Sequence, residues 1–156
     1  MTDQLPDLLK GLTPADAAGV MVLGTPRQLA GGAVLFDIGT EATHLFLVER
    51  GRVNLTMPIQ VGQRQEDVKV EQRGPGQMLG WSALIPPHRF TLKATAPLET
   101  ELIALPRQVL VSHFAAHPAV GHVVISNLAT IIGQRLQVLQ AMWLREMQRV
   151  IEMRCA

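Results

Sequence analysis

The apolar residues change their spacing once along the chain, and this change constrains the fold more than any other feature. From residue 27 to residue 105 they come in short runs rich in β-branched residues, separated by glycine or polar turns. Such runs predict strands joined by hairpins. From Val120 to the end there is no proline, and apolar residues recur every three or four positions. That spacing predicts one long helix.

The predicted strands lie in the middle of the chain and are flanked by helices. They are Ala33–Phe36, His44–Val48, Arg52–Thr56, Val68–Gln72, Phe90–Ala96 and Glu101–Leu105. Thr13 followed by Pro14 is typical of a helix start, and this first helix is expected to end near Gly24. A short helix is expected between Pro106 and Pro118, because proline ends helices.

Two polar segments predict the hairpin turns. Glu49–Arg52 supplies Gly51, which can adopt the positive φ that a tight turn needs. Gly62–Asp67 is polar throughout and predicts the tip of a second hairpin. The middle of the chain is therefore expected to form a compact set of antiparallel hairpins, as in a roll or barrel.

Length and composition indicate a single domain. The 156 residues fit one core, with the roll at about 27–105 and the C-terminal helices at about 107–154. Lys and Arg number 14 against 13 Asp and Glu, so no overall charge favours nucleic acid or an anionic membrane. Cys155 is the single cysteine, and neither a signal peptide nor a membrane-spanning stretch is apparent. We therefore expect a cytoplasmic protein.

Three strings resemble the cyclic-nucleotide-binding domain family, which includes the sensor domain of catabolite activator protein. They are Gly32–Gly39, Leu45–Val53 and Gly76–Leu84, the last followed by Pro87–Ala94. The resemblance covers nearly the whole chain. It implies a mainly β fold with flanking helices, a double-stranded β-helix (jelly-roll) with an N-terminal helix and a long C-terminal helix.

The third string is similar to the family's phosphate-binding cassette. The resemblance implies a short helix whose backbone N–H groups face a cyclic phosphate. Gly80 would allow close approach, and the N–H groups of Ser82 and Ala83 would be free to bind. The candidate site residues are Gly80, Trp81, Ser82, Ala83, His88, Arg89 and Thr91. A cyclic nucleotide or another small anionic ligand is the expected occupant, and no further cofactor is expected.

Two side chains depart from the family's pattern. Trp81 stands where nucleotide binders carry a ribose-binding glutamate, and His88 stands where they carry the phosphate-pairing arginine. Arg89, one place along, points away from the pocket in a regular strand, although a bulge would reverse it. Losing the arginine alone weakens binding by about one to two orders of magnitude, so weak binding of cAMP and cGMP is expected. Trp81 can either stack on a planar ligand or fill the pocket.

Enzymatic and metal-dependent chemistry find little support. His113 and His117 are four apart on a predicted helix, with His122 nearby, but no carboxylate or cysteine accompanies them. The strands carry only His44 and His88, without a close partner at ligand spacing. No set of nucleophile, base and orienting residue is apparent, so we expect no enzyme and no metal site.

The basic residues of the last helix alternate with acidic residues and glutamines. They are Arg135, Arg145, Arg149 and Arg154. This mixture predicts a solvated helix face. Members of the family that read DNA continue past this helix, whereas the sequence ends at Ala156, so direct DNA binding is not expected.

The apolar stripe of the last helix is longer than one roll can cover. Val120–Leu136 can pack on the roll, while the residues beyond it need another surface. A homodimer through Leu139, Trp143, Met147 and Val150 is therefore expected. Two hypotheses remain open. One is a sensor whose ligand shifts the terminal helix and signals to a downstream protein, and the other is a ligand-free scaffold for protein interaction.

Overall fold

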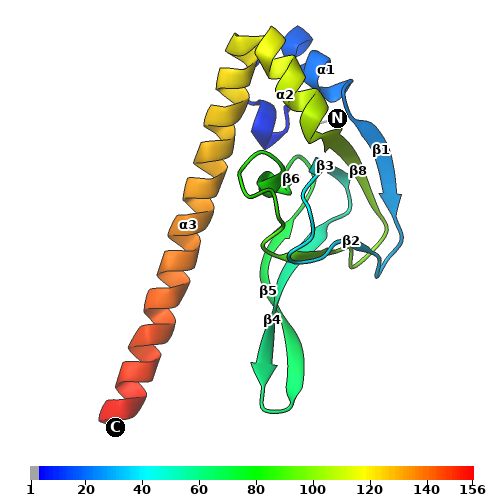
Figure 1. The fold of residues 1–156 in the computed structure, drawn as a ribbon. Coiled ribbons are helices and arrows are strands. Elements are labelled where there is room, and N and C mark those ends of the chain that lie inside the picture. Colours follow the sequence, from blue (N-terminus) through cyan, green and yellow to red (C-terminus); the bar gives the residue numbers. More distant parts are fainter. Residues whose placement is uncertain (1–3) are drawn as a thin grey trace.

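Two antiparallel sheets form the body of the molecule (Figure 1). The computed structural model describes residues 4–156, and in this part of the chain each sheet has four strands, in the orders β1-β8-β3-β6 and β2-β7-β4-β5. The strands are β1 (Thr25–Leu29), β2 (Val34–Phe36), β3 (His44–Arg50), β4 (Val53–Val61), β5 (Arg64–Arg73), β6 (Met78–Leu79), β7 (Lys93–Thr95) and β8 (Thr100–Pro106). The predicted mainly β jelly-roll with flanking helices is confirmed.

Some strand boundaries differ from the prediction. The second hairpin turn contracts to Gly62 and Gln63, because the polar residues 64–67 pair with residues 58–61 as a ladder that projects from the roll. The strand predicted from Phe90 begins at Lys93, because the chain before it pairs only through a bridge between Glu41 and Arg89. The two-residue strand β6 lies outside the predicted strands, since so short a run carries no period.

The helices begin where the prolines and caps predict. A 3-10 turn, η1 (Asp7–Leu9), precedes α1 (Pro14–Met21), and the Thr13 hydroxyl accepts a hydrogen bond from the Asp16 N–H at 3.1 Å. The other two helices are α2 (Arg107–Ala116) and α3 (Pro118–Cys155). Proline at the start of α1 and α3 fits a position whose N–H has no partner within the helix.

The core extends from the roll into the helices. Strand β8 is buried at four consecutive positions from Leu102 to Leu105, and β3 likewise from Leu45 to Val48. Burial on both faces follows because one face lines the roll while the other lies under the N-terminal segment and the helices. The Asn127 side chain of α3 donates to the carbonyls of Leu8 and Lys10, both at 2.8 Å, and so fixes the N-terminal segment on α3.

The turn between β3 and β4 requires glycine. Gly51 has φ +87°, and a Cβ there would lie 2.5 Å from the Thr100 hydroxyl oxygen and 2.7 Å from the Glu99 carbonyl oxygen. The Thr100 hydroxyl donates to the Arg52 carbonyl at 3.0 Å and accepts from its N–H at 3.2 Å. The turn is therefore fixed against the start of β8.

Helix α3 packs on the body along its first third and then extends away from it (Figure 1). Its buried residues end at Ile131, and Leu136 is 55% exposed. The prediction that the stripe covers the roll as far as Leu136 is therefore wrong by about one turn. Ile125, an apolar residue within Val120–Leu136, is 45% exposed. No helix among residues 4–156 has the length and apolar character needed to cross a membrane.

Candidate functional site

The cassette-like segment turns sharply at Gly80. This residue has φ +81°, and a Cβ there would lie 3.3 Å from the His44 carbonyl oxygen and 3.3 Å from the Phe46 ring. Gly80 leads directly into a single 3-10 turn, η2 (Trp81–Ala83). Because an L side chain meets both backbone strain and close contacts here, the segment keeps this shape only with glycine.

The N–H groups of Ser82 and Ala83 were expected to be free for a ligand, and the turn itself uses one of them. The Ala83 N–H donates to the Gly80 carbonyl at 3.0 Å, so the prediction that it is free for a ligand is wrong. The physical reason is that a 3-10 turn bonds each N–H to the carbonyl three residues earlier. Leu84 and Ile85 donate the other bonds, to Trp81 and Ser82, so the Ser82 N–H is not used within the turn.

The pocket beside the turn is very small. Its volume is about 10 Å³, close to the space of one water molecule and far below that of a nucleotide site. The lining residues are Phe36, Leu55, Gly80, Trp81, Ser82, Phe90, Thr91, Leu92 and Arg135. The rings of Phe36 and Phe90 stack with their centroids 3.6 Å apart. The structure therefore brings together four of the predicted site residues, Gly80, Trp81, Ser82 and Thr91.

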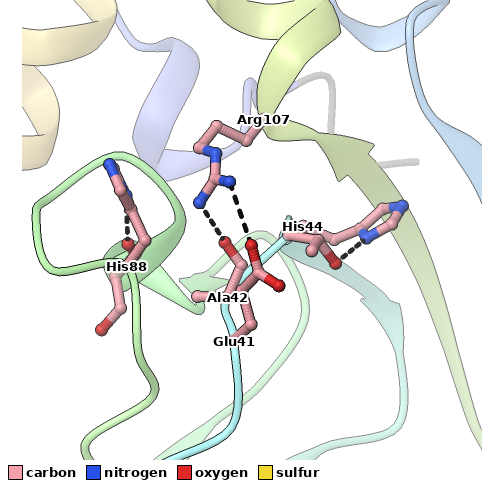
Figure 2. Close-up of polar contacts among 7 residues, drawn as sticks. Glu41, Ala42, His44, His88 and Arg107 are labelled. Carbon is pink, nitrogen blue, oxygen red and sulfur yellow. Dashed lines mark hydrogen bonds and ion pairs between the residues drawn. The ribbon is translucent and has the colours of Figure 1, made fainter.

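The side chain of His88 is hydrogen-bonded to the backbone of the turn. Its Nδ1 lies 3.1 Å from the Ser82 carbonyl oxygen, and because a carbonyl only accepts, Nδ1 carries the proton (Figure 2). Its φ of +58° is in the left-handed region, and its carbonyl accepts from the Ala42 N–H at 2.7 Å. His88 is not among the residues that line the pocket.

Arg89 is directed at another segment. Its Nη1 donates to the Gly39 carbonyl at 3.0 Å in an exposed contact, and it lies outside the strands. The sequence left two orientations open for Arg89, away from the pocket in a regular strand or toward the pocket through a bulge. Arg89 does not line the pocket, but the reason is an irregular backbone rather than strand alternation.

Arg107, which the sequence did not single out, connects the cassette to the helices. At the start of α2, its Nη1 donates to the Ala42 carbonyl at 2.9 Å, and its Nη2 lies 3.5 Å from the Glu41 carboxylate (Figure 2). The N–H of the same Ala42 is bonded to His88. Two hydrogen bonds therefore join the turn after the cassette to the first turn of α2.

Arg135 of α3 is largely buried, and the predicted solvated position is wrong for this arginine. Its side chain is 11% exposed, and its Nε lies 2.6 Å from Glu71 Oε2. Arg73 on β5 pairs with the other oxygen of Glu71. Sequence spacing alone cannot reveal this cluster, because Glu71 and Arg135 lie on different elements far apart in the chain. Arg149 remains exposed, as predicted, and pairs with Glu146 at 3.1 Å.

Burial and charged neighbours shift the pKa values of Arg135 and Asp7. Burial lowers the pKa of Arg135, and the neighbouring Glu71 opposes that shift. Burial also raises the pKa of Asp7, whose Oδ1 accepts from the Met78 N–H at 3.1 Å. A groove of about 930 Å³ opens on the same cluster between η1, β5 and α3. Arg135 lines both this groove and the small pocket at the cassette.

Known proteins resemble this chain in both sequence and fold. A family model described as Cyclic nucleotide-binding domain matches residues 26–117. A Cyclic AMP receptor protein from Thermus thermophilus is 28% identical over 130 residues, covering 83% of this chain and 57% of the relative. The chain therefore spans little more than half the length of that relative.

Solved structures share the architecture. The Thermus thermophilus Catabolite Activator Protein has a TM-score of 0.73 at 26% identity, covering 88% of this chain and 61% of that one. A cyclic nucleotide-binding domain from Methylobacillus flagellatus has a TM-score of 0.80 at 18% identity, covering 90% and 80%. With the family model matching more than half of its residues, this chain belongs to the cyclic nucleotide-binding domain family.

Proposed function

We propose that this chain is a regulatory domain that senses a small ligand, and that it has no catalytic activity. The relatives named above are a receptor and an activator, not enzymes. The observation that carries the proposal is the position of the cassette turn between two helices. It is bonded to α2 through Ala42 and Arg107, and the pocket at its other side is lined by Arg135 of α3.

The altered cassette is expected to bind cAMP and cGMP weakly. Trp81 supplies no acceptor for a ribose hydroxyl, and the His88 side chain is engaged with the Ser82 carbonyl. Neither Arg89 nor His88 lines the pocket, so the strand arginine of the family has no replacement at those two positions. We infer a ligand affinity well below that of family members that carry both side chains.

Calorimetry of the nucleotide-stripped protein with cAMP and cGMP tests this proposal. We expect weak binding by the wild type and roughly 10- to 100-fold tighter cAMP binding by Trp81→Glu, which restores a charged acceptor. Trp81→Gln is the matched control, because it removes the indole without adding the carboxylate. Submicromolar binding by the wild type would contradict the weakened cassette.

We further propose that all 156 residues form one domain and that it dimerises through the distal part of α3. Beyond Arg135 the helix carries apolar side chains that the roll does not cover. Trp143 is 63% exposed, and Leu139 and Met147 are exposed on the same stripe, which continues to Val150. A second copy would cover this stripe by twofold symmetry.

A ligand-free scaffold is the second candidate, and the small volume of the pocket favours it. A volume of about 10 Å³ leaves no space for a nucleotide unless side chains move. In this case Trp81 and the stacked phenylalanines serve packing alone. Native mass spectrometry of the purified protein separates the candidates, because a co-purified small molecule contradicts the scaffold.

A further inference from the structure

The peptide unit that joins Ser82 to Ala83 is held on both sides. On one side, the Ala83 N–H donates to the Gly80 carbonyl at 3.0 Å. On the other, the Ser82 carbonyl accepts from the Ile85 N–H at 3.3 Å and lies 3.1 Å from Nδ1 of His88. Because the N–H and C=O of a planar trans peptide point in opposite directions, these bonds fix the orientation of the peptide plane. The Ala83 N–H is therefore directed into the turn.

The bond from His88 is the contribution that a side chain makes to this orientation. A single 3-10 turn is weakly held by its own bonds, because their geometry is poor. The bond from the Ile85 N–H is the longest of the three backbone bonds within the turn. Ser82 is only 4% exposed, so water cannot readily replace a lost donor at its carbonyl. The second donor, from His88, is thus expected to stabilise the turn.

The backbone around His88 directs the ring at this carbonyl. His88 has φ +58°, a region in which few residues other than glycine lie, although histidine is more frequent there than most. Its N–H donates to the Ile85 carbonyl at 3.0 Å, and its carbonyl accepts from the N–H of the fully buried Ala42 at 2.7 Å. Ala42 is held in turn by Nη1 of Arg107, which donates to its carbonyl at 2.9 Å (Figure 2). Such a conformation persists only where the surrounding structure determines it, and these three bonds do so here.

We propose that His88 is a positioning residue, whose side chain fixes the cassette turn in the conformation that directs the Ala83 N–H into the turn. The contact is autoinhibitory, because the same N–H is then not free to donate to a ligand. Its consequence for binding rests on the proposed sensor function, whereas the contact itself can be tested without any ligand. Failure of one is therefore distinguishable from failure of the other.

The tautomer of His88 in the wild-type chain is the first test. Nitrogen NMR of the imidazole, at a pH where the ring is neutral, distinguishes a protonated Nδ1 from an unprotonated one. We expect the Nδ1–H tautomer, because the Ser82 carbonyl can only accept. The Nε2–H tautomer would overturn the inference, since an unprotonated Nδ1 cannot bind a carbonyl oxygen.

A matched pair of variants separates the hydrogen bond from the backbone conformation. Asparagine and aspartate both tolerate positive φ and have the same shape, but only asparagine has an N–H donor near the position of Nδ1. Amide hydrogen exchange of the full chain, followed by NMR without ligand, measures the stability of the turn. His88→Asp should speed exchange at Ala83, Leu84 and Ile85 by about tenfold, because the donor is replaced by a carboxylate that repels the carbonyl. His88→Asn should restore exchange close to that of the wild type.

The pattern of exchange along the chain decides between a local and a general effect. Amides of β4 and β5 should exchange as in the wild type in both variants, because they lie outside the turn. Equal exchange of the turn in His88→Asp and His88→Asn overturns the inference, as does acceleration that extends equally through β4 and β5. If His88→Asp does not fold, His88→Gly replaces it, because glycine accepts the positive φ and has no donor. Exchange of the turn in His88→Gly that matches the wild type overturns the inference equally.

Discussion

At the scale of single residues, glycine and buried charge determine what this domain can do. Gly80 sets the cassette turn because any Cβ would contact the His44 carbonyl and the Phe46 ring. Arg135 and Glu71 act through charge instead, since they form a largely buried ion pair in which the other oxygen of Glu71 pairs with Arg73. The shape of the cassette turn is therefore fixed by sterics, whereas Arg135 is held by its ion pair with Glu71.

Gly51→Ala is predicted to destabilise the fold more than Gly62→Ala. Both glycines lie in hairpin turns with positive φ, +87° and +63°, so both variants carry similar backbone strain of about 1 kcal/mol. Only at Gly51 does the new methyl group meet other atoms, 2.5 Å from the Thr100 hydroxyl oxygen. We expect an additional loss of about 1–3 kcal/mol in the free energy of unfolding, measured by urea denaturation. If both variants lose the same free energy of unfolding, the close approach of Gly51 to Thr100 is contradicted.

At the scale of elements, α3 has two sections with different surroundings. Its first section packs on the body through Val124, Leu128 and Ile131, and its distal section is largely exposed. Arg135 lies at the junction of the two. The element that binds the roll is thus continuous with the element proposed to bind a second copy.

Trp143→Glu is predicted to convert the dimer into a monomer, because the change buries an unpaired charge in the proposed interface. Light scattering at matched concentrations measures the change in mass. The control is Arg145→Glu, which also introduces a carboxylate but lies roughly 200° around the helix from Trp143. If Trp143→Glu leaves the mass unchanged, or if the control reduces it equally, the stripe is not the dimer interface.

The elements were largely predictable from sequence because their signals are local. Thr13 and Pro14 start α1, Gly51 forms the predicted turn, and the three-to-four spacing predicts α3. The candidate site was less predictable, because it depends on tertiary contacts. The burial of Arg135 depends on Glu71 from another element, and an arginine among acidic and amide side chains on a helix has no local signal for burial.

At the scale of the whole molecule, two sets of contacts, or routes, connect the cassette to the helices. One route passes through the Ala42 backbone to Arg107 at the start of α2, as Figure 2 shows. The other passes through the pocket to Arg135 of α3. A ligand at the cassette can change the helix only through a difference in its affinity for two helix positions.

Hydrogen–deuterium exchange of the wild-type chain, with and without millimolar cAMP, tests this account most directly. If ligand binding is transmitted to the helix, amide protection should change in α3 around residues 128–142 as well as in the cassette around residues 80–91. A change confined to the roll, or identical exchange in α3 with and without cAMP, would contradict the claim that this domain transmits ligand binding through its last helix.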